Sequence, residues 1–547
     1  MSYYYKEFSY DLSTEKVEKT SERKNLLAGL PVYGVESFAP IAERQQTDYF
    51  NTPEDKFTLT DGVTHAEPEY DYMDPAFTHF TFGTGRAIIY KLPCVCAVDE
   101  FNFNFLNQRD VGIGYPYNIA VFVSEDGKAW QRVFFLAAAK ASSPKEMRLI
   151  GGKLEKPIKA LFIRFEFEHS LHTWIESVAA YGTTKIPCRT PSPVDDGIIA
   201  ARANEGVGKY PAYSDLCDVH NIALAYHCFP PEFNDVNHNT SFDKKNILPY
   251  LAYLDREGNI KDTFYDSLLF LPFSRFTYSV HYKTAEGWKF YVDNVFEEHK
   301  NVDAADEVAD DIEKALGIKC EPKIFLSILH TNVTYGDLAD KFGALDDEGD
   351  IDIKSYEGRK KAVKWVIDEQ ISRFNAKERK HVKLVGFYWF EEALNFADEF
   401  DIDLIHFARD YLHEKGLKLI WIPYYQAPGY NKWKEAGFDV ACMQPNYAFS
   451  KEAQKQRLYD NADLCLKYGL CYELELNSVA NDYDINKFKD YLDAGVEAGF
   501  MKTIKMYYEG GRGIKNVCES KDDFARSVYD DTYLFAKEKL VKAVRKE

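Results

Sequence analysis

Glutamates stand in this sequence where a buried strand would ordinarily carry apolar side chains. Residues 470–479 read LCYELELNSV, which places Glu473 and Glu475 two positions apart in an otherwise apolar run. Another acid, Glu392, ends the run VKLVGFYWFEE at 382–392. Side chains two residues apart in a strand point to the same face. Because an unpaired buried carboxylate is strongly destabilising, the pattern predicts either a buried ion pair or a functional site.

Carboxyl groups that face each other suit glycoside hydrolysis. One acts as nucleophile and the other as acid/base at about 5 Å in retaining enzymes, whereas more than roughly 6.5 Å leaves room for a water and inversion. We expect Glu475 to be the nucleophile, or the base if the reaction inverts. Glu392 would be the general acid/base, its pKa raised by burial and by the second carboxylate. Glu473 would position Glu475 or bind a hydroxyl, and retention is favoured.

A structural alternative exists for the pair on the seventh predicted strand. In IKMYYEG on the last predicted strand, one face carries Lys505, Tyr507 and Glu509 and the other Ile and Met. If the first of these faces points inward, Lys505 could neutralise Glu473 and join both glutamates in an inert ion-pair network.

A second alternative concerns Glu391 and Glu392. Both could begin the helix that follows, where acids suit the positive end of the helix dipole. Parity with Gly386 and Tyr388 favours Glu392 as the inward-facing acid, so the helix-start interpretation is preferred for Glu391 alone.

Strand-like runs alternate with helical stretches from about residue 217 onward. The runs are 222–228, 267–273, 323–330, 382–392, 417–425, 439–447, 470–477 and 503–510. This alternation predicts a (β/α)8 TIM barrel over residues 217–547. A doubly wound open sheet is disfavoured because no GxGxxG opens the first βα turn. Barrel chemistry takes place at the carboxyl ends of the strands, and Glu392 and Glu475 end the fourth and seventh.

Sugar sites use aromatic faces and amide groups, and the predicted strand ends are rich in both. We expect substrate contacts from Trp389, Tyr424, Gln444, Asn446, Tyr447, Tyr508, Glu509, Asp266 and His330, with Tyr226, His227, Asn332, Tyr425 and Arg512 as further candidates. Each of these could equally be a core residue. Asp266, like Asp262 before it, could instead serve the turn that leads into its strand.

Residues 1–185 read as an all-β domain, and residues 186–216, rich in Pro, Gly, Ser and Asp, as a linker. The runs LTDG (59–62) and YPYNIAVFVSEDGKAWQRV (115–133), followed by ALFIRFEFE and WIESVAAYG, resemble discoidin-like, galactose-binding-type β-sandwiches. That resemblance implies a carbohydrate-binding module, although many such domains only pack beside a catalytic domain.

The second part resembles an uncharacterised bacterial family known only as a domain of unknown function. The similarity lies in LVGFYWFEE, LIWIPYYQAPGYNKWKEAGFDVACMQPNYAF and YELELN, and extends over about 220–515. It implies a glycosidase-like barrel, often joined to carbohydrate-binding modules, and points by position to Glu392, Glu473 and Glu475. The resemblance does not identify a substrate.

Composition narrows the class of partner. The 547 residues carry a formal net charge of -20, which argues against nucleic acid or an anionic membrane surface. A carbohydrate partner is compatible with this charge, which equally serves solubility. The sequence contains no apolar run of about 18 residues, so no membrane span is predicted. No signal peptide is recognisable. The 10 cysteines lack framework spacing, which favours a reducing, cytoplasmic location.

Other chemistries lack their motifs. No HExxH or GxSxG occurs, so neither a metal nor a cofactor is expected. Two rivals to a glycosidase remain: a non-catalytic carbohydrate-binding protein, and a sugar-phosphate barrel enzyme that would use the EGGRGIK loop with Arg512 and Lys505.

Overall fold

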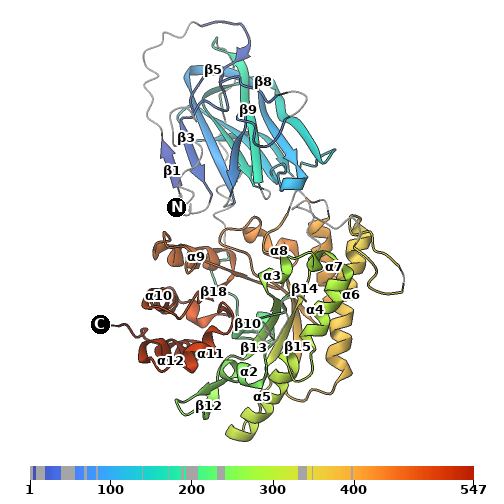
Figure 1. Ribbon diagram of the computed structural model, residues 1–547. Coiled ribbons are helices and arrows are strands. Elements are labelled where there is room, and N and C mark those ends of the chain that lie inside the picture. Colours follow the sequence, from blue (N-terminus) through green and yellow to red (C-terminus); the bar gives the residue numbers. More distant parts are fainter. Residues whose placement is uncertain are drawn as a thin grey trace.

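The protein consists of a β-rich amino-terminal body and a barrel surrounded by helices (Figure 1). The computed structural model describes residues 4–7, 19–38, 56–66, 70–81, 84–137, 139–169, 172–185, 190–191, 207–230, 241–330, 342–347, 349–395, 398 and 400–546. Strands β1 to β9 lie between residues 4 and 183, and the barrel strands lie between residues 221 and 508.

The first body is an antiparallel sheet bent into a sandwich. Within the described residues its strands are β1 (Tyr4–Glu7), β2 (Lys24–Asn25), β3 (Gly34–Ser37), β4 (Thr78–Thr81), β5 (Gly85–Gln108), β6 (Asn118–Ser124), β7 (Gln131–Ala137), β8 (Lys145–Glu168) and β9 (His172–Thr183). Strand β5 changes partners along its length: residues 86–89 pair with β3, and residues 97–106 pair with β9. Register shifts within β5 accompany this change and bend the strand. Phenylalanines from β5 and β8 fill the space between the layers.

The turn between β6 and β7 explains one of the motifs in the sequence. The Asp126 carboxylate accepts from the amides of Lys128 and Ala129 at 2.8 and 2.9 Å, and the Ser124 hydroxyl accepts from the Gly127 amide at 2.9 Å. Gly127 has φ +73°, a conformation that glycine adopts without strain. The SEDG sequence therefore closes this hairpin through side-chain hydrogen bonds.

The second body contains a closed barrel of parallel strands, and each predicted strand is confirmed. In the part of the chain that the structure describes, the barrel order is β10 (Asn221–His227), β13 (Ser267–Pro272), β14 (Lys323–Ile328), β15 (Lys383–Trp389), β16 (Lys418–Trp421), β17 (Val440–Met443), β18 (Cys471–Glu475) and β19 (Lys505–Tyr508). Strand β19 pairs with β10 and closes the ring.

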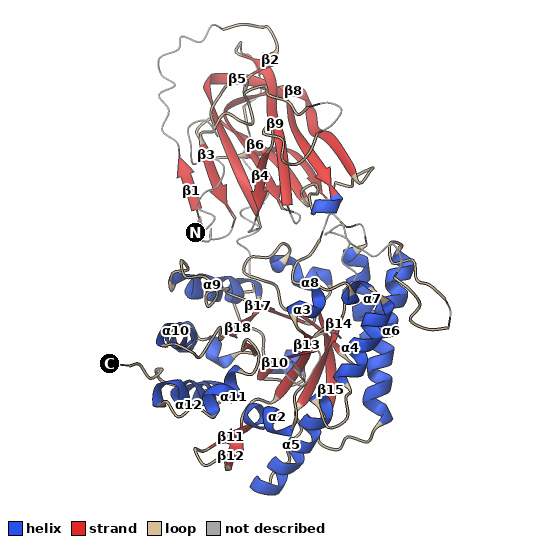
Figure 2. Cartoon of the chain, in the orientation of Figure 1, coloured by secondary structure: helices blue, strands red, loops and turns tan. Residues whose placement is uncertain are grey.

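Helices follow the barrel strands and cover the outside of the ring (Figure 2). They are α2 (Lys244–Leu251), α3 (Ser274–Thr277), α4 (Ala285–Val295), α5 (Asn301–Leu316), α6 (Tyr356–Ala376), α7 (Asp401–Glu414), α8 (Trp433–Ala436), α9 (Gln456–Tyr468), α10 (Asp482–Ala498), α11 (Gly513–Cys518) and α12 (Asp523–Ala536), with a hairpin of β11 (Ala252–Leu254) and β12 (Ile260–Thr263). The side chains of Ser355 and Asn481 cap the amino-terminal ends of α6 and α10 by accepting hydrogen bonds from backbone amides. Glycines directly follow α5, α9 and α10 in left-handed conformations that end these helices.

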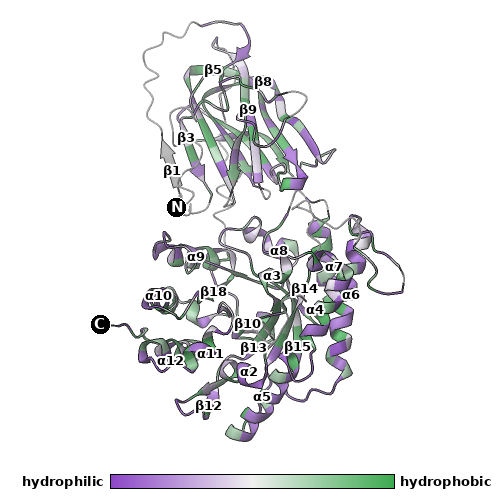
Figure 3. Cartoon of the chain, viewed as in Figure 1, coloured by the Kyte–Doolittle hydropathy of each residue, from purple (hydrophilic) through white to green (hydrophobic). Residues whose placement is uncertain are grey.

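The lower part of the lumen is apolar. Hydrophobic colouring dominates the barrel strands in Figure 3, and one buried cluster joins inward side chains from the strands to a floor made by Leu216 and Val219. Cys471 belongs to this cluster, so the face of β18 that also carries Glu473 and Glu475 points into the lumen. Polar chemistry is therefore confined to the upper layers, near the carboxyl ends of the strands.

The predicted facing of β19 is wrong. Lys505 pairs with Tyr472 and Tyr507 pairs with Leu474, both on the outer face of β18. The Lys505 amine donates to the carbonyls of Met501 and Thr503, each at 2.8 Å. The prediction assumed an apolar outer face, whereas carbonyls and neighbouring side chains satisfy these polar groups outside the lumen.

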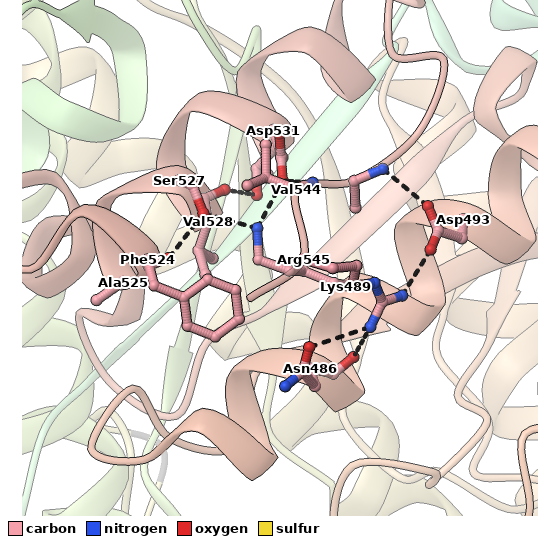
Figure 4. A network of polar contacts seen from close by, with 12 residues as sticks. Asn486, Lys489, Asp493, Phe524, Ala525, Ser527, Val528, Asp531, Val544 and Arg545 are labelled. Carbon is pink, nitrogen blue, oxygen red and sulfur yellow. Dashed lines mark hydrogen bonds and ion pairs between the residues drawn. The ribbon is translucent and has the colours of Figure 1, made fainter. Parts of the chain in front are cut away.

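The last helices are held together by buried ion pairs (Figure 4). Lys489 on α10 lies 2.6 Å from Asp531 on α12, and the two side chains are 0% and 4% exposed. Asp531 also accepts from the Val544 amide at 2.8 Å, and Arg545 lies 2.5 Å from Asp493. The segment after α12 is thereby fastened to the helix that follows β18.

Candidate functional site

The glutamates singled out in the sequence meet above the apolar part of the lumen. Glu473 and Glu475 pair in register with Met506 and Tyr508 of β19, and Met506 lies in the lumen cluster. Glu392 follows β15 by three residues. Glu475 and Glu392 raise the pKa of Glu473, and Glu475 raises the pKa of Glu392. Glu473 and Glu392 thus lie within the reach of neighbouring negative charge.

Glu473 is a buried carboxyl without a cationic partner. It is 2% exposed, and Oε2 has no hydrogen-bond partner among the described residues. Burial, and then the charges of Glu475 and Glu392, raise its pKa well above the usual value. The alternative in which Lys505 neutralises Glu473 is wrong, because Lys505 lies on the outer face. Its surroundings therefore favour the neutral form of Glu473.

Glu475 is fully buried and tightly held. The Asn446 amide donates to Oε1 at 3.1 Å, and the Tyr491 hydroxyl on α10 donates to Oε2. Burial raises the pKa of Glu475 to about 7, while these hydrogen bonds and the charge of Arg457 favour the ionised form. Asn446 has φ +52°, and its carbonyl accepts from Arg457 at 3.0 Å. This left-handed residue directs its amide at the carboxylate.

Glu392 is the more accessible partner of Glu475. Its side chain is partly exposed, and Gln444 at the end of β17 donates a hydrogen bond to it. Burial, with the charges of Glu391 and Glu475, raises the pKa of Glu392 to about 7. Helix α7 begins only at Asp401, so the interpretation of Glu391 and Glu392 as a helix start is wrong.

Aromatic rings line one side of the carboxyl cluster. The rings of Tyr226 and Tyr508 lie 5.3 Å apart, edge to face, and Tyr508 makes a similar contact at 5.3 Å with Phe449. Tyr388, on the inward face of β15, completes this group. Burial and the nearby glutamates raise the pKa values of Tyr226, Tyr388 and Tyr508. Phe449 is 43% exposed, so the wall extends from the lumen to solvent.

Two expected contacts remain beside the glutamates. Gln444 bonds Glu392, as described above, and its side chain also donates to the Ile422 carbonyl at 3.2 Å. Tyr424 is partly buried and packs with Ala393, which directly follows Glu392. Asn446 contributes its backbone amide rather than its side chain to Glu475.

Other expected contacts point away from the lumen. Trp389 is buried in the outer core, with its ring 5.1 Å from that of His330. The Tyr447 hydroxyl donates to Asp490 on α10 at 3.0 Å. Glu509 accepts from the Tyr265 hydroxyl at 3.0 Å. Trp389 points outward because of the alternation of side chains along β15. Tyr447 and Glu509 lie beyond the ends of β17 and β19, where this alternation no longer holds, and their side chains contact the surrounding helices and loops.

The remaining expectations are corrected by position. Asp266 precedes β13, at the end opposite the mouth, and accepts from the amides of His220 and Asn221 at 2.9 and 2.7 Å. It therefore serves the start of the strands. The other candidates lie in the outer core or contact neighbouring helices and loops. They are His227, Tyr425, Arg512 and Asp262. Asn332 lies outside the described residues.

Tyr491 is the residue that sequence reasoning missed. It lies on α10, 16 positions after Glu475, and no strand-end or parity signal leads to it. Among the residues described, no group of three or more His, Cys, Asp or Glu side chains is arranged to hold a metal ion. The described helices include none that is long and apolar enough to cross a membrane.

A family comparison matches the barrel. The profile of the domain of unknown function DUF4855 matches residues 233–534, more than half of the chain. The chain belongs to the DUF4855 family. The matched part of this DUF4855 protein includes Glu392, Glu473 and Glu475. No curated protein matches the chain.

Solved structures are similar to a smaller share of the DUF4855 protein. CpGH89CBM32-6 from Clostridium perfringens is 14% identical, with 29% of this chain and 99% of that chain covered and a TM-score of 0.19. CBM32-3 from a family 31 glycoside hydrolase of Clostridium perfringens is 15% identical, covering 28% and 92%, with a TM-score of 0.20. Truncated AlyQ, with CBM32 and alginate lyase domains, is 14% identical, covering 30% and 35%, with a TM-score of 0.20.

Proposed function

We infer that this protein is a retaining glycoside hydrolase on a (β/α)8 barrel, with Glu392 as general acid/base and Glu475 as nucleophile. The observation that carries the proposal is the contrast between the two carboxyl groups. Glu475 is fully buried and receives hydrogen bonds, whereas Glu392 is partly exposed beside a further acid. Such a pair divides the roles of nucleophile and proton donor.

The environments decide which group holds the proton. Donors from Tyr491 and the Asn446 amide stabilise the ionised form of Glu475. Glu392 has acidic neighbours on both sides, Glu391 and Glu475, which favour its protonated form. Both pKa values are raised to about 7, so near this pH the hydrogen bonds favour the arrangement with Glu475 ionised and Glu392 protonated, which the first step of a retaining mechanism requires.

The surrounding residues suit a sugar. The aromatic wall of Tyr226, Tyr508 and Phe449 offers apolar faces for stacking against a pyranose ring. Burial favours the protonated form of Glu473, which can donate to a hydroxyl. The sugar-phosphate alternative loses support because Lys505 faces outward at the start of β19 and Arg512 donates to the Ser241 carbonyl at 3.1 Å.

Turnover of α- and β-aryl glycosides and oligosaccharides tests the proposal. Wild type should cleave one class, while Glu392→Gln and Glu475→Gln should each lose several orders of magnitude in kcat/KM. Glu497→Gln, an exposed acid on α10, is the control and should keep wild-type activity. Proton NMR of the first product should show the substrate's own anomeric configuration. Full activity of either lumen variant would contradict the assigned role.

A non-catalytic carbohydrate-binding protein is the second candidate. The observation that favours it is the complete burial of Glu475, because a nucleophile must reach the substrate. This function predicts no turnover of any glycan and unchanged binding in both glutamine variants. Isothermal titration with the same oligosaccharides therefore separates the two candidates.

A further inference from the structure

A line of charged side chains runs from helix α7 to the acid beside Glu392. His330 Nε2 lies 3.1 Å from Asp401 Oδ1, and His330 Nδ1 lies 3.7 Å from Glu391 Oε2. His330 follows β14, Asp401 is the first residue of α7, and Glu391 directly precedes Glu392 in the chain. Side chains of His330 and Asp401 are 5% and 1% exposed, whereas that of Glu391 is 27% exposed.

Each member of this line is fixed by a further contact. Asp401 Oδ2 accepts from the Asn395 amide at 2.8 Å, and the His330 amide donates to the Tyr282 hydroxyl at 2.9 Å. The Trp421 indole donates to the Glu391 carbonyl at 2.7 Å. The imidazole is directed toward Asp401, so its placement does not support the role as a direct sugar contact that was expected from the sequence.

We propose that Asp401, His330 and Glu391 form a charge relay that keeps a carboxylate ionised beside Glu392 and so sets the pH range in which Glu392 carries its proton. The inference rests on the proposed function only for its catalytic meaning. Its physical content concerns the charge states of four side chains and can be measured on the protein without substrate.

The geometry favours the cationic form of the imidazole. Burial alone lowers the pKa of His330, but the hydrogen bond and charge of Asp401, followed by the charge of Glu391, outweigh burial and raise it. The opposing group is Arg359 on α6, which is itself paired with Asp398 at 2.6 Å. Tyr282 from the turn His281–Lys283 is the other titratable group that touches His330.

The cation acts on Glu392 through Glu391. A positive imidazolium beside Glu391 favours its ionised form, and an ionised Glu391 disfavours ionisation of Glu392. In this arrangement His330 and Asp401 are positioning residues, because neither faces the lumen. This arrangement gives each of the two consecutive glutamates after β15 a role: Glu392 is the proton donor, and Glu391 supplies the charge that favours its protonated form.

Carbon-13 NMR titration of glutamate side-chain carboxyls tests the relay directly. Spectra of Glu392→Gln and Glu391→Gln assign the two signals. Glu391→Gln should lower the pKa of Glu392 by roughly one unit, since a like charge is removed. His330→Gln, which keeps an amide for Asp401 but no charge, should raise the pKa of Glu391. Asp403→Asn, an exposed acid in the same first turn of α7, should leave both values unchanged.

Two outcomes would overturn the relay. One is an unchanged pKa of Glu392 in Glu391→Gln, and the other is a nitrogen-15 spectrum that shows a neutral His330 ring at pH 6. If the enzyme turns over a glycoside, the alkaline limb of its kcat/KM profile should move to lower pH in Glu391→Gln, whereas a purely structural role would lower activity equally at all pH values. Turnover by Glu392→Gln would instead refute the proposed function and leave the NMR result standing.

Discussion

Replacing Glu473 with glutamine removes a buried carboxyl whose Oε2 atom has no hydrogen-bond partner among the described residues. Its native pKa lies well above 4.5, the ordinary value for a glutamate, because of burial and the charges of Glu475 and Glu392. As pH rises above 4.5, the unfolded chain loses this proton while the native protein keeps it. Between the two pKa values the free energy of unfolding therefore falls by about 1.4 kcal/mol for each pH unit.

Glu475 contributes with the same sign. Its native pKa of about 7 also exceeds 4.5, so stability due to this group is complete below pH 4.5 and is lost as pH rises toward 7. The loss at pH 7 and above amounts to about 3 kcal/mol. Glu473→Gln should leave this contribution and abolish its own, so the stability of the variant should fall less steeply, by about 1.4 kcal/mol per pH unit, from pH 4.5 up to the native pKa of Glu473.

The measurement must report on the barrel rather than on the sandwich. Cys442, Cys465 and Cys471 are buried in the barrel, so their labelling during a pulse of thiol reagent, read by mass spectrometry, follows barrel unfolding in urea. Titrations at several pH values from 5 to 9 give the profile for wild type and for Glu473→Gln. The variant should become more stable than wild type at neutral pH and above.

Parallel profiles would refute the reasoning. They would mean that Glu473 ionises at the same pH in the folded and unfolded chain, which requires a cation or water that stabilises its charge. Glu497→Gln, which removes an exposed carboxyl from α10, should give a profile parallel to that of wild type and controls for net charge.

The other predictions concern the residues that hold the site and the last helices. Tyr491→Phe should raise the pKa of Glu475, because the lost donor favoured its ionised form, and should cost about 1.5–3 kcal/mol of stability at pH 8. Asn446→Val should destabilise by about 1–2 kcal/mol, since φ is +52°, whereas Asn446→Gly should be nearly neutral in urea unfolding. Lys489→Met should cost about 3–5 kcal/mol by leaving buried Asp531 unpaired, and adding Asp531→Leu should recover most of this loss.

The sequence predicted the elements of the barrel better than the contacts at its mouth. Runs of apolar residues between helical stretches located every barrel strand, because those strands are buried on both faces. Parity on β18 placed Glu473 and Glu475 inward, since Cys471 lies in the lumen cluster. The same rule failed on β19, where Lys505 and Tyr507 satisfy their polar atoms outside the lumen. Hydrogen-bond partners, rather than hydrophobicity, decided that facing.

Contacts made beyond the strand ends were harder to predict. Parity ends where the strand ends, so Tyr447 and Glu509 turn toward helices although they follow β17 and β19. Tyr491 comes from a helix whose rotation about its axis depends on packing against the barrel. The position of His330 after β14 is visible in the sequence, but its partner Asp401 lies 71 residues away. Such pairs follow from the closed barrel rather than from local pattern.

The distribution of side chains along each strand separates folding from chemistry within one lumen. On β10 the inward sequence runs from Ile222 and Leu224 to Tyr226, and on β18 it runs from Cys471 to Glu473 and Glu475. The apolar residues fill the lower lumen and close it against water, which makes the upper layer a poor environment for charge. That environment raises the pKa values of the glutamates. The apolar lower layers therefore offset the free energy of folding lost by burying carboxyl groups in the upper layer. The raised pKa values of these glutamates depend in turn on the apolar residues beneath them.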